Sequence, residues 1–423
     1  MSLRGFTKVG HGPTLLSAFL YFDVSFMVWV MLGPIGPFIA ETLKLTAAQK
    51  GLLTAIPLLG GCFFRIVLGL MTERLGARKT GLIGLGATLV PLFLAWQFAQ
   101  SFTAFLGVGL LLGIAGASFA AALPLASAWY PPEYQGLAMG IAGAGNSGTL
   151  VATLFAPRIA QAIGWRNVFG VALIPVIAVW ILFLILAKDA PSTAKAKSWS
   201  DYASVFKTAD TGWFCFIYSL TFGGFVGLAS FLTIFFHDQY QLTKVQAGDL
   251  TTVVVLFGSF LRPVGGLLSD RVGGYRMLLF LLTGISVCVA AVATLPSVWI
   301  ALALLVCTMA MLGMGNGAVF QMVPQRFSGQ IGVITGVVGA AGGLGGFLLP
   351  TLLGSIKGQT GSFGIGFALC SAVVMTGAAS LLFLGRVWRR EWDPNSAARA
   401  GLFTARLPGM QVSRAIANRP EAF

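Results

Sequence analysis

The fold is decided by Arg65-Ile-Val-Leu-Gly69-Leu-Met-Thr-Glu73-Arg74-Leu-Gly76-Ala-Arg78 and by its partner, Arg262-Pro-Val-Gly-Gly266-Leu-Leu-Ser-Asp270-Arg271-Val-Gly273-Gly-Tyr-Arg276. In both stretches an arginine inside an apolar run precedes a glycine, an acidic–basic pair and a second glycine. The matched residues lie 197 positions apart, as 65 and 262 do. An ionisable side chain at membrane depth is costly and marks a functional site by default. The pair therefore predicts a duplicated membrane protein with one central cationic site.

The composition is that of a polytopic membrane protein. Hydrophobic residues make up 57% of the 423 residues, charged residues 9%, and the mean hydropathy is +0.86. A helix needs about 20 apolar residues to cross the hydrocarbon core. Twelve such runs occur, at 14–39, 50–70, 80–99, 102–127, 137–157, 166–187, 212–235, 247–268, 277–295, 298–320, 331–355 and 363–385. We expect an all-α fold, because a β-barrel would show short alternating segments. The long first run also argues against a cleavable signal peptide.

A polar interruption divides the chain six plus six. We expect an N-terminal six-helix bundle at 1–187, a cytoplasmic linker at 188–210, a C-terminal six-helix bundle at 211–385 and a basic cytoplasmic tail at 386–423. The signatures point the same way across an even number of helices. The halves are therefore parallel repeats related by an axis along the membrane normal.

The net charge of +14 is distributed unevenly. With the amino terminus inside, 19 cations fall on the inner side, and the outer side holds Lys44, Lys50, Arg158, Arg166, Lys244 and Lys357. The positive-inside rule then places both termini in the cytoplasm, as in a multi-pass protein of the inner (cytoplasmic) membrane. We expect the basic tail to meet anionic lipid and not nucleic acid. The protein is expected to be a monomer.

The acidic–basic–glycine elements are expected to fill short cytoplasmic loops between the second and third helices of each half. Glycine suits such a tight turn, and the carboxylate can pair with a cation or a helix amino terminus across the bundle. We interpret these loops as gate latches, with a solvated turn as the alternative. Their charged residues are Glu73, Arg74, Arg78, Asp270, Arg271 and Arg276.

The loop element and the six-plus-six layout resemble the major facilitator superfamily over residues 14 to 385. The resemblance implies two pseudo-symmetric six-helix bundles around a central cavity. It also implies that the second and eighth helices, which carry Arg65 and Arg262, line that cavity.

The two arginines are expected near the middle of the membrane. Arg65 lies eight residues before Glu73, which at about 1.5 Å per residue places it roughly 12 Å inside the helix end. Asp23 is the one acidic residue in the middle of a span, so the site carries net positive charge. Guanidinium groups bind planar oxyanions through paired hydrogen bonds, which favours a small planar monoanion. The alternative is that the arginines bind backbone carbonyls or reach the interface.

Two helices are rich in glycine. The fifth contains Gly-Ile-Ala-Gly143-Ala-Gly145-Asn146-Ser-Gly148 and the eleventh Gly339-Ala-Ala-Gly342-Gly343-Leu-Gly-Gly. Glycine at this density permits close helix packing and sliding. Asn146 is either a substrate contact or an interhelical hydrogen bonder.

These glycine-rich helices, together with the two arginines, resemble the nitrate/nitrite porter family. The resemblance implies that Arg65 and Arg262 grip nitrate or nitrite, that Asn146 contributes, and that a tyrosine and aromatic rings complete the site. The matching residues are Tyr218 and Phe222 in Tyr-Ser-Leu-Thr-Phe-Gly, Phe119 in Gly-Ala-Ser-Phe-Ala, and Phe320 in Gly-Asn-Gly-Ala-Val-Phe-Gln-Met.

The sequence gives less indication of what drives transport. Asp23 is a candidate proton site, which predicts proton-coupled nitrate uptake. It is equally read as a partner of Arg65 or as a residue near the helix end. Exchange of nitrate for nitrite, the other mode implied by the resemblance, needs no protonatable group.

Other function classes have little support. No cofactor or metal is expected, because the five cysteines form no CxxC pair and there are two histidines. A membrane enzyme would need an acid pair, a histidine or a metal cluster at depth. An exporter of cations would need several intramembrane carboxylates, and an exporter of another small solute remains a distant alternative.

Overall fold

The structure is a computed structural model that describes residue 6 and residues 9–190, 208–327 and 331–403. Within them lie twelve helical spans that are long and apolar enough to cross a membrane. The prediction of an all-α protein with twelve transmembrane helices is confirmed.

Six spans form the N-terminal half. They are built from α2 (Gly12–Val30) with the short α3 (Gly36–Leu43), α4 (Ala47–Leu75), α5 (Ala77–Gln97), α6 (Phe102–Gly116) with α7 (Phe119–Ser127), α8 (Pro132–Gly143) with the 3₁₀ turn η1 (Ala144–Ser147) and α9 (Gly148–Ile163), and α10 (Trp165–Leu186).

The C-terminal half repeats this pattern. It consists of α12 (Ala209–Tyr240), α13 (Lys244–Phe260) with α14 (Arg262–Val272), α15 (Gly274–Ala293), α16 (Val298–Arg326), α17 (Ile331–Thr360) and α18 (Phe363–Glu391), followed by the short α19 (Pro394–Arg399). The expected linker, 188–210, falls largely outside the described residues, and α12 begins within its last part. Helix α18 continues past residue 385, where the sequence placed the end of the bundle.

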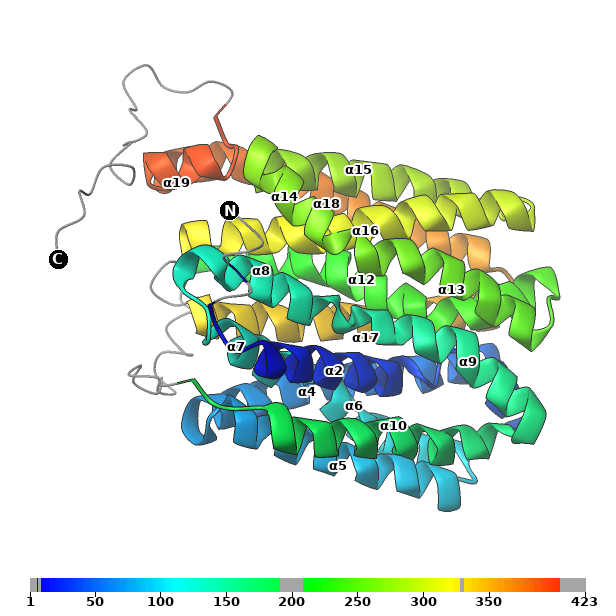
Figure 1. Ribbon diagram of the computed structural model, residues 1–423. Helices are drawn as coiled ribbons and strands as arrows, with labels where there is room; N and C mark the ends of the chain where they lie inside the picture. The colour runs from blue at the N-terminus through cyan, green and yellow to red at the C-terminus, as the bar shows by residue number, and fades with distance from the viewer. Residues whose placement is uncertain (1–5, 7–8, 191–207, 328–330, 404–423) are drawn as a thin grey trace.

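The helices run side by side as one elongated bundle (Figure 1). We name its two ends by the short helices that lie there. The α19 end holds the start of α2 and helix α19, and the α3 end holds α3 and the start of α13. Between the halves, α4 packs against α17, and α9 packs against α13.

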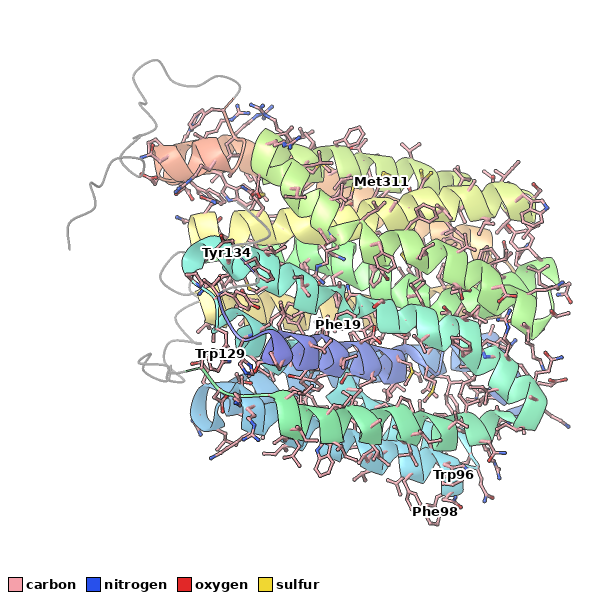
Figure 2. The ribbon with its side chains drawn as sticks, viewed as in Figure 1. Phe19, Trp96, Phe98, Trp129, Tyr134 and Met311 are labelled. Carbon is pink, nitrogen blue, oxygen red and sulfur yellow. The ribbon has the colours of Figure 1, made fainter. Side chains whose placement is uncertain are left out.

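The sides of the bundle carry apolar side chains (Figure 2). Among them Ile174 is 67% exposed and Phe280 is 72% exposed. Trp96 and Phe98 lie near one end, and Trp129 and Tyr134 near the other. Aromatic residues at both ends of an apolar band are typical of a membrane protein's interfacial belts.

Single glycines make the two loops of the repeat. Gly76 joins α4 to α5 with a φ of 87°, and Gly273 joins α14 to α15 with a φ of 90°. A residue with a Cβ is strained at these angles, so the expectation of a tight glycine turn is confirmed. The second turn is also crowded, because a Cβ on Gly273 would collide with the backbone of Gly401.

The glycine turns yield a test of stability. Gly76→Ala is expected to lower the melting temperature of the purified protein, because a strained backbone residue costs about 1–3 kcal/mol. Gly273→Ala is expected to lower it further, because the methyl group also displaces residue 401. Gly107→Ala, where a Cβ meets nothing within 4 Å, is the matched control. Equal melting temperatures for the three variants would contradict this account of the turns.

Candidate functional site

Arg65 projects from the unbroken helix α4 into the centre of the molecule, where it is only 2% exposed. Its Nε donates a hydrogen bond to the carbonyl of Gly116 at 3.0 Å, and its Nη1 donates to the carbonyl of Gly339. The first carbonyl belongs to its own half and the second to the other half. Its Nη2 is buried and has no hydrogen-bond partner among the described residues. The side chain therefore bridges the halves and keeps one donor available.

Arg262 occupies the matching place in the other half but on a different local backbone. It begins helix α14, directly after a break at Leu261. Pro263 explains the break, because proline lacks an N–H and disfavours a helical residue before it. The guanidinium is less buried than that of Arg65, and its Nη1 is also buried without a partner.

The Phe119 ring is shared by both arginines. Its centroid lies 5.8 Å from the Arg65 Cζ and 5.8 Å from the Arg262 Cζ. The two Cζ atoms are therefore at most twice that distance apart. In the described part of the chain no carboxylate forms an ion pair with either arginine. The predicted arrangement of two cations without a fixed anion is present.

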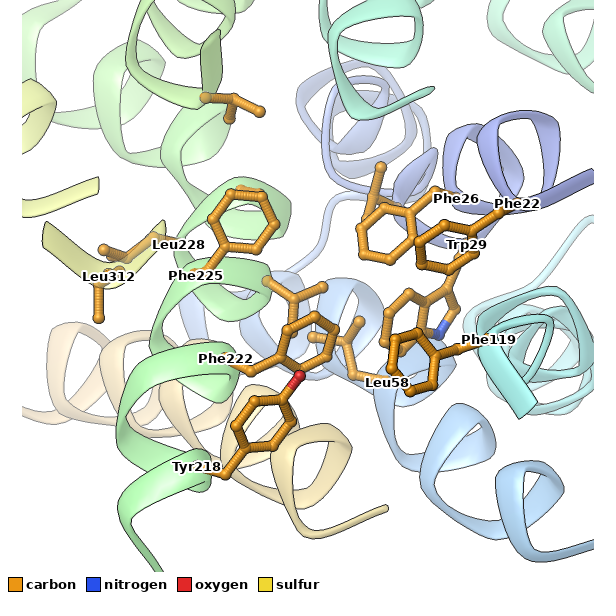
Figure 3. Close-up of a cluster of buried hydrophobic side chains, with 14 of the residues drawn as sticks. Phe22, Phe26, Trp29, Leu58, Phe119, Tyr218, Phe222, Phe225, Leu228 and Leu312 are labelled. Atoms are coloured by element: carbon orange, nitrogen blue, oxygen red, sulfur yellow. The ribbon is translucent and has the colours of Figure 1, made fainter. Parts of the chain in front are cut away.

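Further rings form a cage around the two cations, and Figure 3 shows three of its members, Trp29, Phe119 and Phe222, gathered in one buried cluster. Arg65 also lies 5.0 Å from the Trp29 ring and 4.9 Å from the Phe222 ring, and Arg262 lies 5.8 Å from the Phe320 ring. Ring faces attract cations, by about 2 kcal/mol when the pair is desolvated. The rings thus stabilise both charges without neutralising them.

Tyr218 lies between the rings of the C-terminal half. It stacks on Phe222 with ring centroids 5.2 Å apart and contacts the edge of Phe320 at 5.1 Å. The side chain interacts electrostatically with both arginines and through its hydroxyl with Arg262. The structure therefore brings together the two arginines, Tyr218 and the three phenylalanines that the sequence singled out.

The glycines of α17 make room for this cage. A Cβ on Gly342 would lie 2.8 Å from ring atoms of both Tyr218 and Phe222. A Cβ on Gly343 would lie 3.1 Å from backbone atoms of α4, and Gly339 supplies the carbonyl that Arg65 binds. These positions explain why small residues are needed where α17 meets the site.

The glycines of the fifth span pack against α2. Cβ atoms on Gly145 and Gly148 would collide with the backbone of Asp23, whereas one on Gly143 would meet nothing within 4 Å. Asn146, between them in the turn η1, is 1% exposed, and its Oδ1 has no hydrogen-bond partner within the part of the chain that the structure describes. Such buried unpartnered atoms are uncommon and call for an explanation.

Asp23 does not contact Arg65. Its Oδ1 accepts a hydrogen bond of 2.6 Å from the hydroxyl of Ser147, the neighbour of Asn146. Of the two alternatives that the sequence left open, a pair with Arg65 is not formed in this conformation. The carboxylate is instead tied to the turn that carries Asn146.

Comparison with known proteins assigns the chain to a family. The model of the Major Facilitator Superfamily matches residues 17–350. A nitrite extrusion protein of Bacillus subtilis is 34% identical over 86% of this chain and 91% of its own length. A probable nitrate transporter, NarT, of Staphylococcus carnosus is 34% identical over 81% of this chain and 88% of its own. A probable nitrate/nitrite transporter, NarK2, of Mycobacterium tuberculosis is 32% identical over 82% and 89%.

This chain belongs to the nitrate/nitrite porter family of the major facilitator superfamily. The resemblance drawn from the two arginines and the glycine-rich helices is thereby confirmed.

Two of the charged loop residues in this porter, Arg78 and Arg276, contact their own half or the segment that directly follows it. The backbone N–H of Arg78 donates to Asp189 Oδ1 at 2.9 Å, and its guanidinium donates to the carbonyl of Leu184 at 3.0 Å. Arg276 donates to the carbonyl of Phe403. A latch between the halves by Glu73, Arg74, Arg78, Asp270, Arg271 or Arg276 stays a prediction.

Sequence reasoning missed four residues of the porter's centre. Trp29, Phe22 and Phe26 lie on one face of α2, and the Trp29 indole donates to the Pro57 carbonyl at 2.7 Å. Asn316 lies one turn before Phe320 and has a buried, unpartnered Oδ1. The sequence held an indication of each. The three aromatic residues of α2 are spaced to lie on one face of a helix, and Asn316 follows Phe119 by the repeat distance of 197.

The glycine at 342 provides a test of the ring packing. Gly342→Ala is expected to lower the porter's melting temperature, because overpacking a fitted site costs about 1–3 kcal/mol. Gly336→Ala lies on the same helix where a Cβ meets nothing within 4 Å, and it is expected to be neutral. If both variants melt like the wild type, Tyr218 and Phe222 are not held against α17 as described.

Proposed function

We propose that this porter carries nitrate, nitrite or both across the inner (cytoplasmic) membrane by alternating access. One observation carries the proposal: two guanidinium groups, one from each half, share the Phe119 ring, and each has a buried N–H without a partner. The curated relatives are named for nitrate or nitrite transport or extrusion, which supports the same ligands. The function requires no enzymatic step and no cofactor.

The cage favours a small, weakly hydrated planar anion. Each guanidinium group presents its own donors in one plane, which suits the oxygens of nitrate or nitrite. The surrounding rings offer no hydrogen bonds, so an anion that enters loses most of its hydration. Sulfate or phosphate would lose more hydration free energy than two arginines return. The tyrosine hydroxyl and the Asn146 amide are further candidates to bind the ligand's oxygens.

Anion binding also provides a reason for the halves to move together. Without a bound anion, two like charges in a medium of low dielectric oppose the approach of the halves. An anion between Arg65 and Arg262 removes that opposition. It would also compete with the Gly339 carbonyl for Arg65, which changes a contact between the halves.

We further propose that the α19 end faces the cytoplasm. Among the described residues this end carries Arg74, Arg78, Lys79, Lys188, Arg271, Arg276, Arg326, Arg386, Arg389, Arg390 and Arg399. The α3 end carries Lys44, Lys50, Arg158, Arg166, Lys244 and Lys357. The difference supports cytoplasmic termini by the positive-inside rule, with basic residues near the anionic lipid of the inner leaflet. The boundaries 1–187, 188–210, 211–385 and 386–423, and a monomeric state, are part of the proposal.

Asp23 supports proton-coupled uptake as the mode of transport. Its carboxylate is bonded to Ser147, next to Asn146. Protonation would reverse the donor–acceptor relation at Oδ1 and shift the turn η1. Protonation of Asp23 would thus affect Asn146 through its neighbour Ser147. Nitrate/nitrite antiport is the second candidate, because one relative is named a nitrite extrusion protein.

Substitution of the arginines tests the binding site. Arg65→Lys and Arg262→Lys are expected to lower uptake of labelled nitrate into proteoliposomes about 100-fold, since a lost charge-assisted bond costs about 3 kcal/mol. Arg166→Lys, at the surface, is the control. Unlabelled nitrite and chlorate are expected to compete and a cationic dye is not. Near-wild-type uptake in either site variant would rule out the two-arginine mechanism.

Substitution of Asp23 tests the coupling. Asp23→Asn is expected to abolish nitrate accumulation driven by an inward proton gradient, because the amide takes up no proton. Exchange of internal nitrite for external nitrate, measured in the same vesicles, is expected to persist and serves as the internal control. Gradient-driven accumulation that survives the change would leave antiport as the better account.

A further inference from the structure

At the α3 end the two halves are in backbone contact along three helix pairs. A Cβ on Gly33, after α2, would collide with the Ser230 carbonyl of α12. A Cβ on Gly51 of α4 would collide with the Pro350 carbonyl of α17, and one on Gly248 of α13 would lie 2.8 Å from the Thr153 carbonyl of α9. Three glycines therefore let the halves approach closely on three sides.

Toward the α19 end the spacing differs. Cβ atoms on Gly140, Gly143, Gly266 and Gly336 would each meet nothing within 4 Å. The first two lie on α8, which leads into α9, and the others lie on α14 and α17. The same spans that touch at the α3 end thus have open space nearer the α19 end.

Three ion pairs lie at the α3 end of these contacts, and each joins the two halves. Lys50 Nζ lies 2.6 Å from Asp238 Oδ2, at the ends of α4 and α12. Arg158 of α9 binds Asp249 of α13 through two hydrogen bonds, of 2.6 and 3.1 Å.

The third pair joins Lys244, at the start of α13, to Glu41 of α3. The pair Arg326–Asp210, in contrast, lies within the C-terminal half at the α19 end.

We propose that Lys50–Asp238, Arg158–Asp249 and Glu41–Lys244 form the outer gate of the porter, which holds the site closed to the outside and must break before an anion enters from there. The proposal rests on the proposed function for its orientation, with the α3 end outside. All three pairs span the plane along which the halves separate, so opening this end breaks all of them together. The glycine contacts bring the rims close enough for the pairs to form.

The three ion pairs differ in how much they stabilise the closed gate. The Lys50 and Asp238 side chains are 21% and 17% exposed, whereas Arg158 and Asp249 are 44% and 38% exposed. Solvent screens the more exposed pairs and reduces their effect. The Lys50–Asp238 pair therefore carries the largest share, and its loss is expected to shift the open-to-closed ratio about fivefold.

The Glu41–Lys244 pair of the gate is expected to stay formed at neutral and mildly acidic pH. The pKa of Glu41 lies below its usual value because Lys244 donates a hydrogen bond to it and adds a positive charge, with a smaller contribution from His237. A carboxylate with a lowered pKa keeps its pair above its ordinary pKa and loses it only as the pH falls through the lowered value. A pH dependence of transport near neutrality would then come from another group.

The gate is tested by distance measurement. Spin labels replace Gln161 and Gln359, which are exposed at the α3 end in opposite halves, in a variant without native cysteines. Double electron–electron resonance is expected to show a longer-distance population about fivefold larger in Asp238→Asn. The charge swap Lys50→Asp with Asp238→Lys is expected to restore the wild-type distribution. Asp210→Asn, which removes the pair within one half, is the control.

The outcomes separate the gate from the transported ligand. A distribution that Asp238→Asn leaves unchanged, or that the charge swap fails to restore, overturns the gate. Nitrate uptake is measured in the same preparations. If the distances shift as expected while the wild type takes up no nitrate, the proposed ligand is wrong and the gate stands. If the wild type takes up nitrate and the distances do not respond, the gate alone is wrong.

Discussion

The structure depends on two positive charges in its interior that have no carboxylate partner among the described residues. Burial of an unpaired charge is among the costliest arrangements in a protein. The chain meets this cost with backbone carbonyls and ring faces, which lower the energy of a guanidinium but leave its charge in place. Arg65 binds the Gly116 and Gly339 carbonyls, and Trp29, Phe119 and Phe222 surround it. A site of this kind favours an anionic ligand.

The glycine pattern follows from the same constraint. Large rings pack close to the arginines. The helices behind these rings therefore need glycine at the points of contact. Gly342 leaves room for Tyr218 and Phe222, and Gly116 leaves room for the indole of Trp29. Helix α17, which carries Gly342, also packs against α4 of the opposite half. Packing around the cations and contact between the halves therefore involve the same helix, which links the site to the interface between the halves.

Local patterns in the sequence were sufficient for the spans, the duplicated arginines and the turns at Gly76 and Gly273, because length, hydropathy and backbone freedom decide them within a few residues. Contacts between the halves could not be predicted in this way. Lys50 and Asp238 are 188 positions apart, and nothing local to either indicates the partner. The Arg65–Gly339 hydrogen bond could not be predicted either, because every residue has a backbone carbonyl and the sequence does not indicate which one accepts. The repeat also relates Phe119 to Asn316, 197 positions later.

The two arginines of the repeat lie in different local structures. Arg65 lies within a continuous helix and is tied to both halves, whereas Arg262 begins a helix after a proline-induced break and is less buried. A symmetric pair would present the same environment to the ligand from either side. Here Arg65 is anchored through two hydrogen bonds to backbone carbonyls, whereas Arg262 lies against the Phe119 and Phe320 rings and interacts with the Tyr218 hydroxyl. An anion would therefore bind to a fixed group and draw in a more adaptable one, so closure of the two halves can follow from binding.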